Sequence, residues 1–470
     1  MTHDTDSPRR FPSLFHKTIE ELGLLSLWQS PFDTKLLIAQ RFIRLFAYGG
    51  STLILASYLS ALDIADDRIG LFMTLTLVGD VAISFLLTLF ADAMGRRAVL
   101  GLGSALMVGS GVVFALSGNY WWLLTAAVLG VISPSGNEIG PFKAVEESTL
   151  AHLTPREFLR DILLWYSLFG TAGTALGVMA CGWAINLLES ECGWEYIPAC
   201  RAIFLAYAAI GALKFALSVS LSHKVEADIK TSKSKQQQQQ QQRSDETQPL
   251  LGDRNETRET QDQGRKSFLS FLGERDLVSL VIRLFILFGL DSFASGLASL
   301  SWMTYFFKRK FSLPEGTLGS IFFTTSIIAA ISMLLASSIA KRIGNIKTMV
   351  FTHLPSAICL ALIPLFDLPL ALTLLILRAC TQNMDVAPRS AFLAAALPAD
   401  KRTAIMGAIN VVKTSMQSAG PLITGVLADK GVFGASFTLA GVLKCVYDLG
   451  ILISFLGLER ERERNEQEGV

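Results

Sequence analysis

Charge is scarce in this sequence. Only 17% of its 470 residues are Asp, Glu, Lys or Arg, whereas 51% are hydrophobic. This composition is too apolar for a string of soluble domains and favours a protein that crosses a membrane many times. The formal net charge is +1, and no basic, aromatic-rich stretch stands out, so no nucleic-acid partner is predicted.

Signatures of several enzyme and pump classes are also missing. The sequence has no GxxxxGK[ST] phosphate loop, which argues against an ATP-driven pump. Its six cysteines have no metal-ligand spacing to histidine, so we expect no bound metal. We also expect no cofactor and no enzyme activity. The N-terminus is polar, and a cleavable secretory signal is therefore not expected.

What the sequence has in abundance is long apolar runs. About six occur between residues 36 and 222 and about six more between residues 277 and 458. Each run is long enough, at roughly 20 residues or more, for a helix to span the hydrocarbon core of a bilayer. The sequence therefore predicts an all-α membrane protein with about twelve transmembrane helices.

These runs divide the chain into five predicted segments. They are a cytoplasmic tail (1–35), an N-terminal six-helix half (36–222), a disordered cytoplasmic loop with a glutamine run (223–276), a C-terminal six-helix half (277–458) and a second cytoplasmic tail (459–470). Basic residues gather in loops on one side, which the positive-inside rule assigns to the cytoplasm together with both termini. The glutamine run and an acidic-dileucine pattern suggest a plasma membrane or a vacuolar or endosomal membrane.

A short charged turn at residues 89–97 separates two of the apolar runs. Asp92, Gly95, Arg96 and Arg97 resemble the loop between the second and third helices of the major facilitator superfamily. In a gating role, Asp92 at a helix start and the two arginines would lock the outward-facing state. The alternative is that the arginines only fix the orientation of the hairpin; we favour gating.

The two halves of the sequence look like copies, which strengthens this resemblance. Four elements recur at a nearly constant offset: Arg44-Leu45-Phe46 as Arg283-Leu284-Phe285, residues 91–95 as 340–344, Glu138 and Pro141 as Asp385 and Pro388, and Gly177 with Gly182 as Gly420 with Gly425. The resemblance implies two pseudo-symmetric halves with a substrate site between them. Residues 132–142 resemble an uncharacterised group of fungal and bacterial members.

Charges inside the predicted spans are candidate coupling or gate residues, because each costs about 2.5–3.5 kcal/mol to insert. Asp80 and Asp291 lie near the middle of their spans, and either could exchange protons or be held ionised by a neighbouring arginine; we favour coupling for Asp291. Glu138 and Asp385 lie at equivalent span ends. They could form a switchable gate with Arg44, Arg283 or Arg378, or pair statically within each half.

Polar side chains in the first, fourth, tenth and eleventh spans are candidate cavity liners or interhelical hydrogen-bond partners. They are Tyr48, Asn137, Gln382, Asn383, Asn410 and Lys413. Cys192 and Cys200 share a loop on the predicted outer side, where we expect a disulfide.

Together these observations predict a secondary transporter that moves a small organic solute by alternating access, coupled to protons. The resemblance also implies a monomer in the bilayer. It does not extend to a substrate, because the fifth span lacks the Gly-Pro element of drug-proton antiporters and the sugar-porter motifs are missing. A transporter-like receptor or sensor without net flux is the alternative from another class.

Overall fold

The structure, a computed structural model, describes residues 24–130, 132–135, 141–155, 157–226, 274–398 and 401–468. Asn137 and Glu138 lie outside these residues, and of Asp92 only the backbone is described. The central segment from 227 to 273 also lies outside them. Within the described part of the chain, all regular structure is helical.

The described residues of the N-terminal half form eight α-helices: α2 (Leu24–Gln29), α3 (Phe32–Ala61), α4 (Asp66–Met94), α5 (Arg96–Leu116), α6 (Tyr120–Gly130), α7 (Pro141–Leu153), α8 (Leu159–Ser190) and α9 (Tyr196–Val219). The C-terminal half also forms eight: α12 (Glu274–Leu297), α13 (Leu300–Phe311), α14 (Glu315–Ile343), α15 (Asn345–Leu362), α16 (Leu368–Thr381), α17 (Val386–Ala396), α18 (Arg402–Asp429) and α19 (Phe433–Glu468). Two short 3-10 turns, His223–Val225 and Ile363–Leu365, follow α9 and α15.

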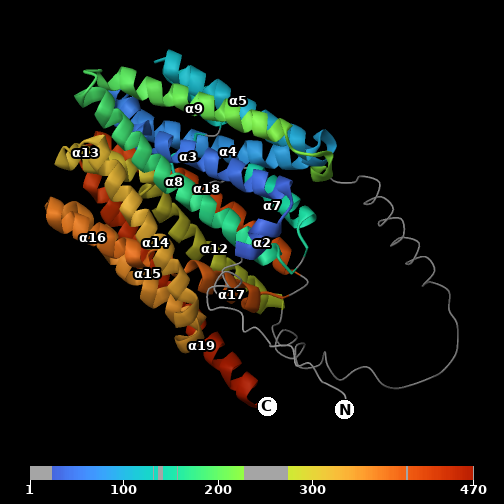
Figure 1. The fold of residues 1–470 in the computed structure, drawn as a ribbon. Helices are drawn as coiled ribbons and strands as arrows, with labels where there is room; N and C mark the ends of the chain where they lie inside the picture. Colours follow the sequence, from blue (N-terminus) through green and yellow to red (C-terminus); the bar gives the residue numbers. More distant parts are fainter. Residues whose placement is uncertain are drawn as a thin grey trace, which may run out of the picture.

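Eight helical stretches of the described chain are long and apolar enough to cross a membrane, with α12 and α13 counted as one. The long helices α4 and α18 and the broken pairs α6/α7 and α16/α17 supply four more spans. The predicted fold class is confirmed: the protein is an all-α membrane protein of two six-span halves. In Figure 1 the spans run side by side as one tilted bundle.

The two halves pack by the same pattern. In the first, α3 lies on α8 and α5 on α9; in the second, α12 lies on α18 and α15 on α19. The halves meet where α8 contacts α14 and where α4 contacts α18 (Figure 1). The two contacts are equivalent, because α8 corresponds to α18 and α4 corresponds to α14 in the repeat.

The repeated glycines explain this pattern. A Cβ at Gly177 would strike the backbone of Phe46 in α3, and a Cβ at Gly420 would strike Gly296 in α12, so both lie against their own half. One and a half turns further on, Gly182 packs on α14 and Gly425 packs on α4, both in the other half. Small residues allow helix backbones to approach closely inside a membrane.

The tight turns before α5 and α15 both depend on glycine. Gly95 and Gly344 each have a φ of +89°, a conformation that costs glycine little because it has no Cβ. These turns lie at one end of the bundle, which we call the hinge end. The start of α3 is at the same end, since Asp33 accepts a hydrogen bond of 3.0 Å from the amide of Ser222 beyond α9.

The helices of the fourth and tenth spans extend beyond the apolar runs, which charged residues interrupt near residues 142 and 387. Helix α7 continues to Leu153 and α17 to Ala396. Their charges are accommodated because Glu146 is buried against Arg44, while the Lys143 and Glu147 pair remains exposed.

Candidate functional site

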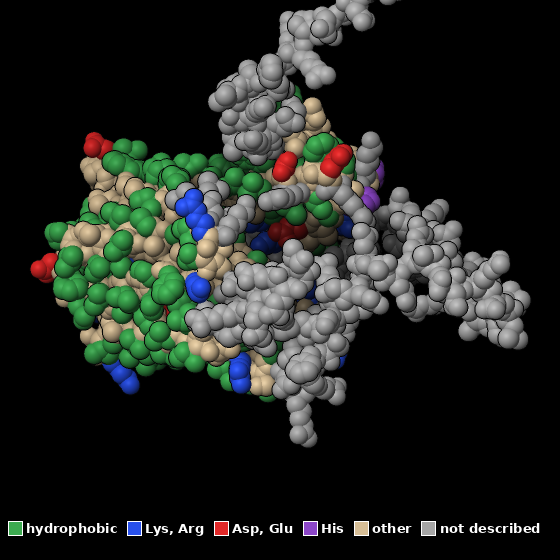
Figure 2. All heavy atoms as spheres, turned by 90° about the horizontal axis from the view of Figure 1, so that it is seen from below, with side chains coloured by type: hydrophobic (Ala, Val, Ile, Leu, Met, Phe, Trp, Pro, Cys, Tyr) green, Lys and Arg blue, Asp and Glu red, His purple; other side chains and the backbone are tan. Residues whose placement is uncertain are grey.

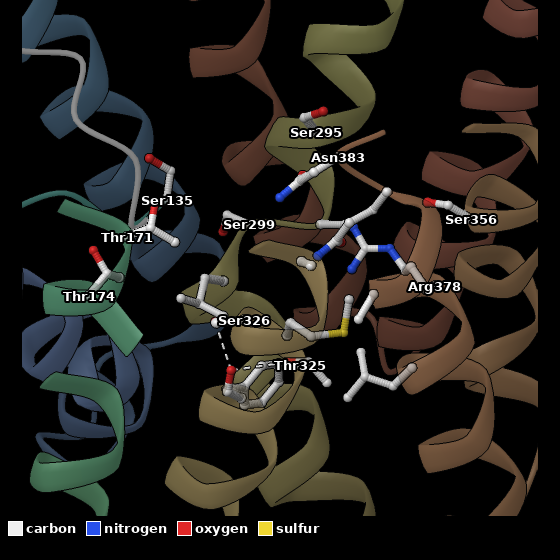
Figure 3. Close-up of a pocket in the computed structure, with 18 of the residues that line it drawn as sticks. Ser135, Thr171, Thr174, Ser295, Ser299, Thr325, Ser326, Ser356, Arg378 and Asn383 are labelled. Carbon is white, nitrogen blue, oxygen red and sulfur yellow. Dashed lines mark hydrogen bonds between the residues drawn. The ribbon is translucent and has the colours of Figure 1, made fainter. Parts of the chain in front are cut away.

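A cavity of about 560 Å³ lies between the two halves (Figure 3). A volume of this size suits a small organic molecule. One wall carries Ser135, Thr171 and Thr174, and the facing wall carries Arg378, Asn383 and Ser356. Between them lies the break between α12 and α13, where Ala298, Ser299 and Leu300 line the cavity.

The cavity lies on the hinge-end side of a sealed layer. At this layer Ser301 of α13 donates a hydrogen bond of 2.8 Å to the carbonyl of Thr52 in α3. The amide of Ser301 also donates to the carbonyl of Pro134, at 3.2 Å. The lining residues of α3, Arg41 and Leu45, precede Thr52.

Beyond this layer, further polar contacts join the halves at the end opposite the hinge end. Arg309 pairs with Asp66 at 2.5 Å, and Tyr305 donates a hydrogen bond of 3.2 Å to the same carboxylate. On the other side of the bundle, the indole of Trp183 donates to Ser320 at 3.0 Å. These hydrogen bonds between the halves all lie on the closed side of the cavity.

The N-terminal half buries one compact charge cluster. Arg44 is only 1% exposed and donates two hydrogen bonds, of 2.9 and 2.8 Å, to the carboxylate of Glu146. Tyr166 donates to the same carboxylate at 2.7 Å and accepts a bond of 2.8 Å from Arg41. Bidentate pairing of this kind fixes geometry as well as charge.

The C-terminal half buries a longer chain of charges. Asp291 of α12 accepts a hydrogen bond of 2.6 Å from Lys444 of α19 and lies 3.4 Å from Arg389 of α17. Arg389 also pairs with Asp385, one turn earlier. This chain reaches the cavity, because Lys444 lines it.

A second acid and base pair stands beside that chain. His353 of α15 lies with its Nδ1 2.9 and 3.0 Å from the two carboxylate oxygens of Asp448 in α19. Both residues are buried, at 4% and 1% exposure, yet the imidazole also lines the cavity. Within the C-terminal half, two titratable systems therefore reach the same space.

The charged lining of the cavity has one sign. Its charged or imidazole side chains are Arg41, Lys143, His353, Arg378 and Lys444, and no carboxylate belongs to the lining among the described residues. Figure 2, viewed from below the bundle of Figure 1, shows basic and acidic side chains in a recess of a face that is otherwise largely hydrophobic. The charged side chains of the described lining are therefore basic, and the carboxylates that partner several of them lie behind the cavity wall.

The described gate charges that form ion pairs do so within their own halves in this state. Arg44 meets Glu146, Asp385 meets Arg389, and Arg283 is exposed on α12. Asp291 is held by Lys444 together with an arginine, which matches the alternative of a carboxylate kept ionised. Asp80 is buried in α4 at 2% exposure.

The predicted cavity liners separate into two groups. Gln382 and Asn383 line the cavity. Tyr48 instead stacks on Tyr207 inside the N-terminal half, with ring centroids 6.3 Å apart. Two residues of α18 lie outside the lining: Asn410 is exposed, and Lys413 lies 6.0 Å from the ring of Phe288.

The turn motif contacts the chain just beyond α9 in this state, and the two loop cysteines are not bonded to each other. The backbone amides of Arg96 and Arg97 bond the carboxylate of Glu226, at 2.7 and 3.2 Å, so in this state the motif contacts its own half. Cys192 and Cys200 are free thiols, and the expected disulfide is absent from the structure. Cys192 is exposed, whereas Cys200 of α9 is buried, so the two side chains lie in different environments.

Sequence reasoning missed the residues that hold these networks together. Glu146 and Arg389 lay beyond the predicted ends of their spans. His353, Lys444 and Asp448 lay inside predicted spans, and the rule applied to Asp291 would have found them. Lys444 and Asp448 are spaced i and i+4, which puts both on one helix face.

Most of the chain is similar to known proteins. The sequence profile of the Major Facilitator Superfamily matches residues 37–421 and 284–470. The uncharacterized membrane protein YJR124C of Saccharomyces cerevisiae is 36% identical over 433 residues, which cover 91% of this chain and 95% of that protein. That relative agrees with the resemblance to a fungal, uncharacterised group.

Solved transporters share the fold at low sequence identity. A D-xylose-proton symporter has a TM-score of 0.66 at 14% identity, with 89% of this chain and 96% of that chain covered. A bacterial homologue of the human lysosomal transporter Spinster, inward-facing and unoccupied, has a TM-score of 0.65 at 13% identity, with 90% and 96% covered. The nucleoside transporter NupG has a TM-score of 0.65 at 13% identity, with 90% and 99% covered. The chain belongs to the major facilitator superfamily.

Proposed function

We propose that this protein is a secondary transporter that carries a small polar organic solute across a membrane by alternating access. The observation that carries this proposal is the cavity between the halves, which hydrogen bonds between the halves close on the side away from the hinge end. If the basic loops of the hinge end face the cytoplasm, the described state is inward-facing. The protein would work as a monomer in a plasma, vacuolar or endosomal membrane, with both termini cytoplasmic.

Alternating access requires the sealed layer to open while the hinge end closes. Two kinds of contact must break. Those at the periphery are few and polar, such as the ion pair of Arg309 with Asp66, and at the glycines the helix backbones of the two halves pack closely. Arg309 is 48% exposed at its side chain, so its pairing with Asp66 contributes little free energy and can exchange with water. In the outward-facing state, the Asp92 to Arg97 turn would then leave Glu226 and contact the other half.

Proton coupling would run through His353 and Asp448. Histidine is the side chain that changes charge closest to neutral pH, and this imidazole lines the cavity while bonded to a carboxylate. The charged groups around it are Asp448, Lys444 and Asp291. Asp291 already has two cationic partners, Lys444 and Arg389.

The test is proton-linked flux in proteoliposomes, measured across a panel of labelled organic solutes. We expect solute-dependent proton movement in the wild type, and we expect His353→Gln to abolish it while solute exchange persists. The matched control is His152→Gln, because His152 is exposed in the last turn of α7. Unchanged proton movement in His353→Gln would refute this coupling route, and absence of flux for every solute would refute the transporter proposal.

A further inference from the structure

Arg378 differs from the other cationic side chains of the cavity. It lies in the last turn of α16, and its guanidinium extends into the cavity beside Asn383 (Figure 3). Its Nε is buried without a hydrogen-bond partner. Among the described residues, no carboxylate and no hydrogen-bond acceptor contacts its guanidinium.

The other cationic lining residues of the C-terminal half already have partners. Lys444 bonds Asp291 and Ser295, at 2.6 and 2.8 Å, and His353 bonds Asp448. In the other half, Arg41 donates to Tyr166 and lies over its ring, 4.0 Å from the centroid. Lys143, also in the other half, pairs with Glu147 at 3.8 Å. Among the described lining residues, Arg378 is therefore the cation without a hydrogen-bond or ion-pair partner.

We propose that the transported solute is a small hydroxylated organic anion whose carboxylate binds Arg378. This inference rests on the proposed transport function and names the substrate class for the same cavity. An unbalanced cation at membrane depth is costly and is expected where a ligand supplies the missing charge. A guanidinium matches a planar carboxylate with two parallel hydrogen bonds, which a lysine cannot reproduce.

The remaining wall indicates what the body of the solute carries. Thr171, Thr174 and Ser326 donate their hydroxyl protons to backbone carbonyls of their own helices, at 3.2, 3.3 and 2.7 Å. Each hydroxyl therefore presents oxygen lone pairs to the cavity, and these accept hydrogen bonds. A solute with several hydroxyl groups would satisfy them, while the amides of Gln382 and Asn383 can donate to its oxygens.

A single unbalanced cation also favours a single negative charge. A carboxylate carries one charge, whereas a phosphate monoester carries between one and two at neutral pH. We therefore assign the carboxylate, and a phosphate ester of similar size becomes the comparison that separates the two anions.

The first experiment uses chemical protection, which does not depend on knowing the natural solute. The full-length protein in nanodiscs is treated with the arginine reagent phenylglyoxal, and modification of Arg378 is followed by mass spectrometry. We expect gluconate and lactate to slow this modification at least threefold, and gluconamide and lactamide to have no effect. Arg68, which is exposed in α4, serves as the internal reference and should react equally in all samples.

The second experiment measures binding with solutes of one size and different charge. Gluconate, glucose, glucosamine and glucose 6-phosphate are compared by thermal shift and by uptake. We expect the carboxylate to bind, and Arg378→Gln to weaken its binding at least tenfold with partial rescue by Arg378→Lys. The matched control, Arg68→Gln, should bind like wild type. Arg378→Gln should fold without loss of thermal stability, because it removes an unbalanced charge.

Three outcomes would overturn the assignment. The first is equal protection of Arg378 by acids and amides, and the second is binding of a neutral or cationic solute that Arg378→Gln leaves unchanged. Tighter, Arg378-dependent binding of the phosphate ester would overturn the carboxylate assignment. Flux of a solute without dependence on Arg378 would refute the anion proposal alone and leave the transport function intact.

Discussion

The two halves share a fold but bury their charges in different ways. In the N-terminal half, Arg44 and Glu146 form one closed bidentate pair, braced by Tyr166. In the C-terminal half, Asp291 connects Lys444 to Arg389, and the chain ends at the cavity. A closed pair suits a static role, whereas a shared and cavity-facing chain can respond to a solute. Arg41 brings the N-terminal cluster to the cavity as well, but Arg44 and Glu146 do not line it. We therefore expect the Arg44 and Glu146 pair to support the structure and the Asp291 chain to respond to the solute.

The largest expected effect is on the closed pair. Glu146→Gln leaves the buried charge of Arg44 without its partner, and we expect a loss of about 3–5 kcal/mol in stability. Thermal unfolding in detergent measures it. The neighbouring Glu147→Gln is the matched control, because Glu147 is 41% exposed at its side chain and forms only a loose pair of 3.8 Å with Lys143. Equal effects of the two substitutions would contradict a structural role for the Arg44 pair.

A smaller loss of stability is expected in the charge network of Asp291, Lys444 and Arg389. After Asp291→Asn, Arg389 keeps Asp385 and Lys444 keeps Ser295, so the loss should be nearer to about 1–3 kcal/mol. Transport should fall far more than stability, because Lys444 lines the cavity. The control is Asp429→Asn, at the exposed last residue of α18. A variant that is as unstable as Glu146→Gln but transports normally would remove the proposed contrast between the halves.

The smallest effect on stability should come from the peripheral contact between the halves. Asp66→Asn removes the partner of an exposed arginine and should cost about 0.2–1 kcal/mol. Its signature is instead a shift toward the state opened at this end, visible as faster labelling of cysteines introduced behind the sealed layer. Glu195→Gln, another exposed acidic residue, is the control and should leave labelling unchanged. Slower labelling in Asp66→Asn would mean that this pair does not hold the end closed.

Most of the fold could be predicted from the sequence because bilayer thickness fixes span length. Periodic apolar runs, the turn glycines and the glycine repeat in the fifth and eleventh spans all correspond to observed elements. Span ends were less predictable, since a charge can be buried when a partner from another span meets it. Glu146 illustrates this, because its partner Arg44 is 102 residues away in the sequence.

The candidate site was only partly predictable. Gln382 and Asn383 were identified as liners from their position at the end of a span, and Arg378 was identified as an in-span charge. Which charges pair could not be derived, because Asp291 and Lys444 are brought together by the packing of α12 on α19. The same holds for Cys192 and Cys200, where proximity in the sequence says nothing about side-chain direction.

The central claim is that the described state is one of two, related by opening of the end opposite the hinge end. Spin labels at Ser190→Cys and Lys430→Cys, both exposed at that end, report the distance between α8 and α18 as the end opens, in a background without the six native cysteines. Gly182→Ala should shift the distribution to longer distances, because its Cβ would strike the backbone of Glu315 in the other half. Gly109→Ala, whose Cβ would meet nothing within 4 Å, should leave it unchanged. A single distance that neither solute nor Gly182→Ala alters would contradict alternating access.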